Sequence, residues 1–136
     1  IGQDYAPALK GKIVLDAGNP NPRRDGPIAE AAVAKGAGIA TAEHLPGARI
    51  VRAFNQLNNK VFLSQAHRAG DKVAVPLAGD DAEALAVAAR LVTDAGFEPV
   101  VVGSLAAGKS FDSSAPIFLK TLTARELRDA LKLPPR

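Results

Sequence analysis

Two asparagines stand where an α/β protein can carry out chemistry. Asn19 lies at the end of the apolar run Lys12–Asn21 (KIVLDAGNPN), and Asn55 lies in the similar run Arg49–Asn59 (RIVRAFNQLNN). Each run is typical of a buried strand that ends in polar amides, and ligands bind beyond the carboxyl ends of parallel strands. Amides at that place can donate and accept at a carboxamide or flavin-like ring edge without adding charge. Because asparagine also favours turns, the spacing leaves both roles open.

Other kinds of catalytic site have less support in the sequence. There is no cysteine and no G-x-S-x-G sequence, so thiolate chemistry is excluded and a serine nucleophile is disfavoured. His44 and His67 lack the spacing of metal ligands, which favours surface or loop-packing roles. Asp16 lacks the D-x-D spacing of phosphatases, and a structural role is favoured for it. The neighbouring carboxylates Asp80 and Asp81 are explained by helix capping.

Two further patterns resemble anion or nucleotide sites. Gly36-Ala37-Gly38 begins like a dinucleotide fingerprint, but it follows an expected helix rather than a strand, which indicates a helix terminator. Arg23 and Arg24, in the loop Gly18–Gly26, could clamp a phosphate or a carboxylate. A solvated loop tip explains these arginines equally well.

Composition places the chain among ordinary globular proteins. Its 136 residues are 47% hydrophobic and 23% charged, enough for one domain with a core. No apolar run reaches the roughly 18–20 residues of a membrane helix, and the first residues do not resemble a signal peptide. The chain contains no cysteine, so nothing points to an oxidising compartment. A cytoplasmic protein is therefore expected. The net charge of +3 is scattered and aromatic residues make up 4%, which disfavours nucleic acid as a partner. The chain contains no methionine, even at position 1, so it is expected to be a processed or truncated piece.

The periodicity predicts strands that alternate with helices, and hence a mostly parallel, doubly wound α/β sheet. A helix end is expected within residues 1–11, with Gly11 as its stop. Asp80 and Glu83 are predicted to cap one helix, and Thr123 and Glu126 have the same spacing before the last. The expected strands are 13–16, 50–54, 72–78 and 100–102; the expected helices are 27–37, 60–66, one that starts at 79–81 and ends before Gly96, 116–122 and 123–131, with one more turn at 41–45 and a loop at 103–114.

The residues that carry a family resemblance are KIVLDAGNPNPRRDGP, HLPGARIVRAFNQLN and PLAGDDAEALAVAARLVTDAGFEPVVVGSL. Together they resemble the NADP-dependent oxidoreductases of the coenzyme F-420 (deazaflavin) reductase type, over roughly residues 11–105. Cytosolic domains of some ferric reductases are similar. The resemblance implies a Rossmann domain that binds NADP and passes hydride to or from a deazaflavin, a flavin or a small acceptor. In such a reaction the protein mainly supplies orientation, so no acid–base pair is required.

The resemblance also implies roles for particular residues. Asn19 and Pro20 match the segment that borders the nicotinamide ribose. Asn55 is the residue implied to touch the reacting rings, and as a loop amide it is expected to contribute little to the core. The other implied cofactor contacts are Phe54, Leu57, Gly103 and Leu105. The family often has proline after that glycine, where this chain has Ser104.

One departure from the family concerns its first half. The glycine loop that holds the pyrophosphate and the segment that reads the 2′-phosphate have no counterpart, so residues 1–136 match a partial Rossmann-like domain, with a final helix and tail at 123–136. The chain alone is expected not to bind dinucleotide tightly. Its first strand, 13–16, is expected to expose an edge that pairs with a missing N-terminal half or a second copy. The alternatives are a non-catalytic interaction module that docks through this edge, and, more distantly, a phosphate-handling enzyme that uses Arg23, Arg24 and Asp16.

Overall fold

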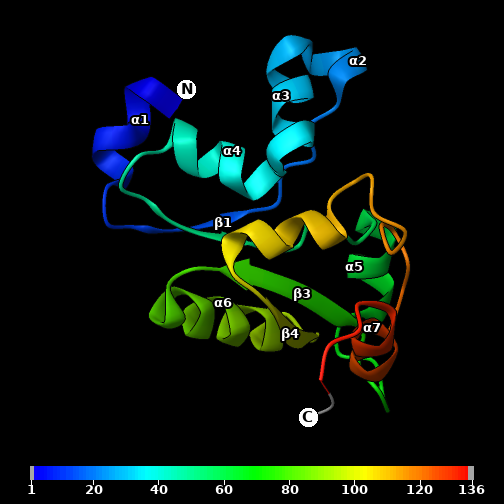
Figure 1. Cartoon of the computed structure of the whole chain (residues 1–136). Coiled ribbons are helices and arrows are strands. Elements are labelled where there is room, and N and C mark those ends of the chain that lie inside the picture. The colour runs from blue at the N-terminus through cyan, green and yellow to red at the C-terminus, as the bar shows by residue number, and fades with distance from the viewer. Residues whose placement is uncertain (1, 135–136) are drawn as a thin grey trace.

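The computed structural model describes residues 2–134, and in these residues helices flank a four-stranded sheet (Figure 1). The predicted loop at 103–114 contains a 3-10 helix, η1 (Leu105–Phe111), and the predicted helix at 116–122 is wrong because these residues form turns and coil. None of the helices in this part of the chain is long and apolar enough to span a membrane. The elements are α1 (Gly2–Leu9), β1 (Ile13–Asp16), α2 (Pro22–Asp25), α3 (Pro27–Lys35), α4 (Ala37–His44), β2 (Arg49–Arg52), α5 (Asn59–Gln65), β3 (Ala74–Gly79), α6 (Ala82–Asp94), β4 (Glu98–Gly103), η1 (Leu105–Phe111) and α7 (Ala124–Ala130).

The sheet has the strand order β1-β2-β3-β4. The pairs β1–β2 and β3–β4 are parallel, which confirms the predicted mostly parallel α/β class. The pair β2–β3 is antiparallel and is the one exception in this mostly parallel sheet. The reason lies in α5, which is only seven residues long and lies beyond the end of β2, so the chain turns back without crossing a face of the sheet (Figure 1).

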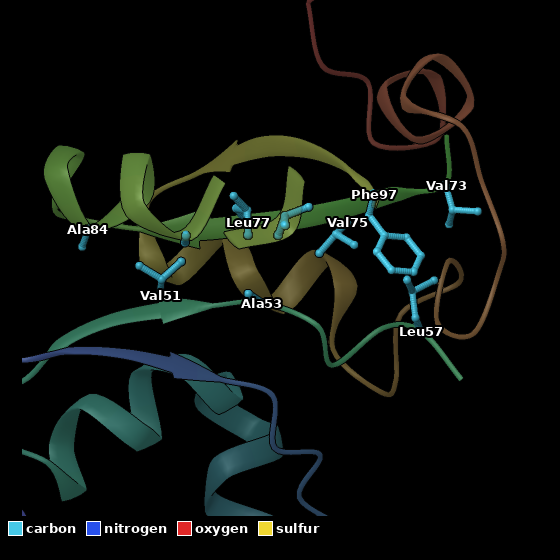
Figure 2. Packing of buried hydrophobic residues seen from close by; sticks show 10 residues of the cluster. Val51, Ala53, Leu57, Val73, Val75, Leu77, Ala84 and Phe97 are labelled. Atoms are coloured by element: carbon cyan, nitrogen blue, oxygen red, sulfur yellow. The ribbon is translucent and has the colours of Figure 1, made fainter. Parts of the chain in front are cut away.

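Both faces of the sheet are covered, and β3 shows this most clearly because all six of its residues are buried. Successive side chains of a strand point to opposite faces. On one face, Val75 and Leu77 pack with α6 and with Phe97, which lies among Val73, Val75 and Leu57 in Figure 2. On the other face, Ala74 and Ala78 belong to a second cluster that includes Phe111 and Leu127. The continuous apolar sequence of β3 therefore reflects burial on both sides.

The edge strand β1 has a strand neighbour on one side only within residues 2–134. Its four residues are all half-buried, whereas the inner strand β3 is fully buried. The backbone groups of Ile13 and Leu15 face away from β2, because Lys12 O and Asp16 O accept the bonds from β2 and its continuation. The predicted open edge is therefore present in the described part of the chain.

Helix ends differ in detail from the sequence predictions. The predicted helix 27–37 ends at Gly36, where φ is +103°, and α4 begins at the next residue. α4 includes residues 41–44 of the turn expected at 41–45 and is capped by Leu45. The cap of α6 is Asp81, whose carboxylate accepts from the backbone N–H of Ala84, so the prediction of Asp80 as this cap is wrong by one residue. The capping box of α7, between Thr123 and Glu126, is confirmed.

An ion pair joins the start of β2 to the start of α6. Arg49 donates through Nε and Nη2 to the two carboxylate oxygens of Asp81, at 2.7 and 2.8 Å, and also contacts Glu83. This guanidinium holds the pKa of the Asp81 carboxyl well below its usual range, assisted by the Ala84 backbone N–H. Because the pKa is lowered on folding, Asp81 stabilises the fold above its unfolded pKa of about 4 and loses that contribution as the pH falls through the folded value.

We therefore expect acid to destabilise the protein less when Arg49 is replaced. In Arg49→Gln, the free energy of unfolding should fall less steeply below about pH 4 than in the unmodified protein, since Asp81 then titrates nearer its ordinary range. The measurement is urea unfolding over a pH series, with Arg90→Gln on the exposed face of α6 as the control. An unchanged acid slope in Arg49→Gln would show that the ion pair does not control this dependence.

Candidate functional site

The carboxyl ends of β1 and β2 lie in one row that crosses the whole sheet. Asp16 pairs with Arg52, Arg52 with Ala78, and Ala78 with Gly103. β3 and β4 run opposite to β1 and β2, but β2 and β3 pair only through Val51–Gly79 and Arg52–Ala78, so that their carboxyl ends overlap. This row is therefore the end of β1, β2 and β4 and the next-to-last position of β3. The row therefore brings three predicted features of the sequence, the loops after Asp16, Arg52 and Gly103, to one level of the sheet.

Arg52 is fully buried at the centre of this row. Its Nε and Nη2 donate to Oδ1 of Asp112 at 3.0 and 2.7 Å. Its Nη1 donates to the backbone oxygens of Asp16 and Gly18 at 3.2 and 2.5 Å, and Nη2 also reaches Oδ1 of Asn19 at 3.4 Å. All five N–H groups of the guanidinium thus have acceptors, which a lysine could not reproduce.

The carboxylates around Arg52 have further partners that hold the surrounding segments. Asp112 accepts from the backbone N–H of Ala37, the first residue of α4, at 2.9 Å. Asp16 accepts from the Thr41 hydroxyl at 2.9 Å and from the backbone N–H of Gly18 at 2.9 Å. These bonds support the structural role that the sequence favoured for Asp16. The end of η1, the start of α4 and the β1–α2 loop all meet at one buried arginine.

The two predicted amides are brought together. Nδ2 of Asn19 donates to the backbone oxygen of Asn55 at 2.8 Å, and Nδ2 of Asn55 approaches Oδ1 of Asn19 at 3.5 Å. Asn55 is only 3% exposed and also donates to the backbone oxygen of Phe111 at 2.9 Å, so the expectation that it contributes little to the core is wrong. Its Oδ1 is buried without a hydrogen-bond partner among the described residues, whereas Asn19 is half-buried.

Asn19 and Pro20 lie between two hollows of the surface. One, here called the helical groove, holds about 510 Å³ between α1, the end of β1, α3 and α4. The other, the serine hollow, holds about 420 Å³. The helical groove is lined chiefly by Tyr5, Leu9, Ile28, Ala29, Ala32, Ala40 and Leu45, with Asp16, Gly18 and Thr41 at its polar end; the serine hollow is lined by Asn21, Pro22, Val33, Ser113, Ser114 and Phe118. Both include Asn19, Pro20 and Arg24, so this loop can meet a ligand from either side.

Phe54 and Leu57 lie on the opposite face of the sheet from Arg52. Leu57 is buried in the cluster that includes Phe97, and the ring of Phe54 packs against Phe62 with a centroid distance of 5.6 Å. Phe54 has a φ of +61°, which is uncommon for a residue with a side chain. This conformation turns the ring of Phe54 into the core, immediately before Asn55 in the chain. Such strained backbone positions are often found at functional sites.

Gly103 and Leu105 lie two strands away from Asn55. Leu105 is buried against α4, where a Cβ at Gly38 would approach Leu105 Cδ1 to 2.9 Å, so that glycine permits the contact. The backbone N–H of Leu105 donates to Asp80 at 2.9 Å. Gly103 and Leu105 thus anchor η1 over the sheet, and η1 then returns the chain to Asp112.

Arg23 and Arg24 lie on the short helix α2, so the prediction of a loop over the whole of 18–26 is wrong at 22–25, where Asn21 caps a helical turn. The two arginines differ from each other. Arg24 donates to both carboxylate oxygens of Asp25 at 2.6 and 2.7 Å and to the backbone oxygen of Asn19 at 3.1 Å. The Arg24 guanidinium lowers the pKa of the Asp25 carboxyl to about 2. Because Asp25 already neutralises Arg24, this loop offers a weaker phosphate clamp than two free arginines would. Arg23 is exposed on the same short helix.

The histidines do not contribute to this row. The exposed His44 contacts the backbone oxygen of Ala40 at 2.7 Å through Nδ1, and His67 donates its backbone N–H to Gly96 O at 3.1 Å. Within residues 2–134, no group of three or more His, Cys, Asp or Glu side chains is arranged to hold a metal ion.

Comparison with solved structures identifies the architecture around this row. A hypothetical protein from Sinorhizobium meliloti matches with a TM-score of 0.70 and 26% identity, over 90% of this chain and 62% of that protein. A candidate F420-dependent NADP reductase from Arthrobacter sp. FB24 matches with a TM-score of 0.64 and 24% identity, over 79% of this chain and 50% of that protein. The chain has a Rossmann-like fold. It spans less than two thirds of the length of either of these structures.

Comparison with family models and curated proteins assigns no family to the chain. No protein-family model matches the chain, and no curated protein matches it.

Two central residues of this site, Arg52 and Asp112, were not predicted as site residues from the sequence. The sequence did contain a signal for Arg52. This charged residue ends the short strand RIVR directly after Val51, which is buried, so the two side chains point to opposite faces of the sheet. No local signal marked Asp112, which lies 60 residues later in a segment predicted as a loop. Only the return of η1 across the sheet brings it to Arg52.

Proposed function

We propose that this chain is part of an NADP(H)-dependent oxidoreductase of the F420-dependent NADP reductase type. The reaction is hydride transfer between NADP(H) and a deazaflavin, a flavin or a small acceptor. The observation that carries the proposal is the meeting of Asn19 and Asn55 at the carboxyl ends of β1 and β2, with Asn19 between two hollows. A structural neighbour that is a candidate F420-dependent NADP reductase supports the same reading.

The residues present fit the nicotinamide end of such a cofactor. Asn19 has a second Nδ2–H beyond the one bonded to Asn55 O, and Asn55 Oδ1 is a buried acceptor without a partner in the described chain. The apolar lining of the helical groove suits an uncharged ring face. Bound NADPH supplies the hydride from its nicotinamide ring.

In this proposal the chain itself orients and encloses the ligand. Asn19 and Pro20 border the ribose side of the nicotinamide. Asn55 orders the loop that faces the reacting rings, and the turn at Phe54 and the packing of Leu57 keep that loop rigid. Gly103 and Leu105 hold η1 over the same level of the sheet, which excludes water from the row. Orientation of this kind lowers the barrier without a protein acid or base.

Replacing Asn55 tests this proposal. We expect Asn55→Ala to lower the free energy of unfolding by about 1–3 kcal/mol, because the backbone oxygen of Phe111 loses its donor in a buried site. We also expect kcat/KM for NADPH oxidation to fall beyond what this instability explains, since the loop beside Asn19 loses its order. The measurement combines urea unfolding with NADPH oxidation by the protein in its natural full length, at a temperature where all variants are folded.

The matched control is Gln56→Ala. Gln56 is 2% exposed and donates through Nε2 to the backbone oxygens of Ile117 and Lys120, so its loss should cost comparable stability away from Asn19. The proposal expects a much smaller loss of kcat/KM in Gln56→Ala than in Asn55→Ala. Equal losses in the two variants would show that Asn55 acts only on folding.

A second candidate function is a non-catalytic interaction module. It is favoured by the open edge of β1 and by the exposure of Tyr5 and Ile28, at 59% and 58%, beside the helical groove. This alternative predicts a dimer, or a complex with a partner chain, in which the amides of Ile13 and Leu15 are protected from hydrogen exchange. It also predicts that NADPH gives no protection at Asn19, which separates it from the oxidoreductase.

A further inference from the structure

The Asn19 side chain is held in one orientation by two groups of opposite hydrogen-bonding character. Its Nδ2 lies 2.8 Å from the backbone oxygen of Asn55, which can only accept. Its Oδ1 lies 3.4 Å from Nη2 of Arg52, which can only donate, and 3.5 Å from Nδ2 of Asn55. A flipped amide would place an oxygen against the Asn55 oxygen and an N–H against the Arg52 guanidinium. Both contacts would then be repulsive.

Arg52 cannot release this orientation easily. It is fully buried, and its other four N–H groups bond to Asp112, Asp16 O and Gly18 O. A Cβ at Gly108 would lie 3.2 Å from Cγ of Arg52, so η1 packs directly on the stem of the arginine. The guanidinium is thus fixed by three segments of the chain, and the Asn19 loop is fixed by the guanidinium.

We propose that Arg52 determines the specificity of the site by fixing the polarity of the Asn19 amide, which then offers only an N–H donor to a ligand. One N–H of Nδ2 is used by Asn55 O, and the other has no acceptor among the described residues. Asn19 is half-buried and lines both hollows, so a ligand bound in either would lie beside this residue. The group that binds there is an oxygen acceptor, such as a carboxamide or hydroxyl oxygen of a nicotinamide nucleotide. This ligand assignment rests on the proposed function, whereas the fixed orientation does not.

The orientation is tested in the unmodified protein and in Arg52→Lys. The scalar coupling across the hydrogen bond between Asn19 Nδ2 and the Asn55 carbonyl carbon is measured by NMR. We expect the coupling in the unmodified protein and a loss of it in Arg52→Lys, because an ammonium cannot reproduce the five-fold contact of the guanidinium. Absence of the coupling in the unmodified protein, or an equal coupling in Arg52→Lys, would overturn the role of Arg52.

The donor is tested with two isosteric variants of the same loop and with NADPH as the probe. Asn19→Asp keeps an oxygen for Arg52 but replaces the donor with an acceptor. Asn21→Asp makes the same change of charge two residues later, where the oxygen still accepts from the backbone N–H of Arg23. We expect Asn19→Asp to raise the Kd for NADPH about ten- to hundredfold more than Asn21→Asp does, because a buried donor–acceptor contact is lost.

The outcomes separate the two proposals. Equal changes of Kd in the two variants would overturn the donor role of Asn19 while leaving NADPH binding, and so the proposed function, intact. Failure of the unmodified full-length protein to bind NADPH would overturn the proposed function and the ligand assigned to Asn19. The coupling would then still decide the orientation of the amide.

Discussion

Replacing Arg52 with methionine is expected to lower the free energy of unfolding by about 3–5 kcal/mol, since it leaves a buried carboxylate without its counter-charge. Asp112 is 7% exposed and receives two of the five hydrogen bonds from Arg52. The same change releases the backbone oxygens of Asp16 and Gly18, so the Asn19 loop also loses its anchor. The measurement is urea unfolding, with the NMR signals of Gly18 and Asn19 as a local readout.

Two further variants isolate the buried charge as the cause. Arg49→Met removes the other arginine of β2, whose side chain is 28% exposed, so a smaller loss is expected. Adding Asp112→Asn to Arg52→Met should recover part of the lost stability, because a neutral amide still accepts from Ala37 N. If Arg52→Met costs no more than Arg49→Met, or if the double variant is less stable than the single one, the buried ion pair is not what holds this end of the sheet.

Replacing Phe97 with alanine is expected to cost about 3–5 kcal/mol, because it leaves a cavity that the core cannot fill. Phe97 is 1% exposed and its ring contacts Phe62 of α5 edge-on, with a centroid distance of 5.2 Å. Phe62 in turn packs on Phe54, the residue in the left-handed turn before Asn55. The cavity therefore lies next to the support of the proposed site, and urea unfolding measures its cost.

Phe97→Leu provides the matched control, since it keeps most of the volume and should cost less than about 1.5 kcal/mol. A third variant, Leu91→Ala on the exposed side of α6, should cost little because Leu91 is 47% exposed. If Phe97→Ala and Leu91→Ala are equally stable, the packing between β4, α5 and α6 is not the core of the domain.

The strands were the most predictable elements because each is a short apolar run, β-branched in β1, β2 and β4, bounded by polar or turn-forming residues. The Ile13–Asp16 strand was predicted with its observed bounds, and the capping box of Thr123 and Glu126 was recognised from spacing alone. The direction of β3 was not predictable, since it depends on where the short helix α5 lies rather than on any residue of β3. The turns at 116–119 were mistaken for a helix because they are apolar; Ile117 is buried in the core, and its backbone oxygen accepts a hydrogen bond from Gln56 Nε2.

The site was predictable only in part, for the same reason. Asn19 and Asn55 follow strands, so the sequence alone indicated a shared edge. Arg52 and Asp112 depend on a contact 60 residues apart, which no local pattern encodes. The cap of α6 shows a finer limit, because the capping-box spacing to Glu83 favoured Asp80, whereas the cap is the adjacent Asp81. Arg49 and the backbone N–H of Leu105 decide between them.

Hydride transfer by the protein in its natural full length tests the central claim most directly. NADPH carrying two deuterium atoms at the nicotinamide C4 is mixed in turn with coenzyme F420 and small carbonyl acceptors, whose carbon-bound label is analysed by mass spectrometry. Reduction of a flavin is followed by its absorbance instead, because deuterium at the flavin N5 exchanges with water. The proposal predicts deuterium in coenzyme F420 or a carbonyl acceptor, or reduction of the flavin, at a rate that Asn55→Ala lowers far more than Gln56→Ala. Folded protein that neither binds NADPH nor reduces any of these acceptors would contradict it, and the interaction module would then be the better account.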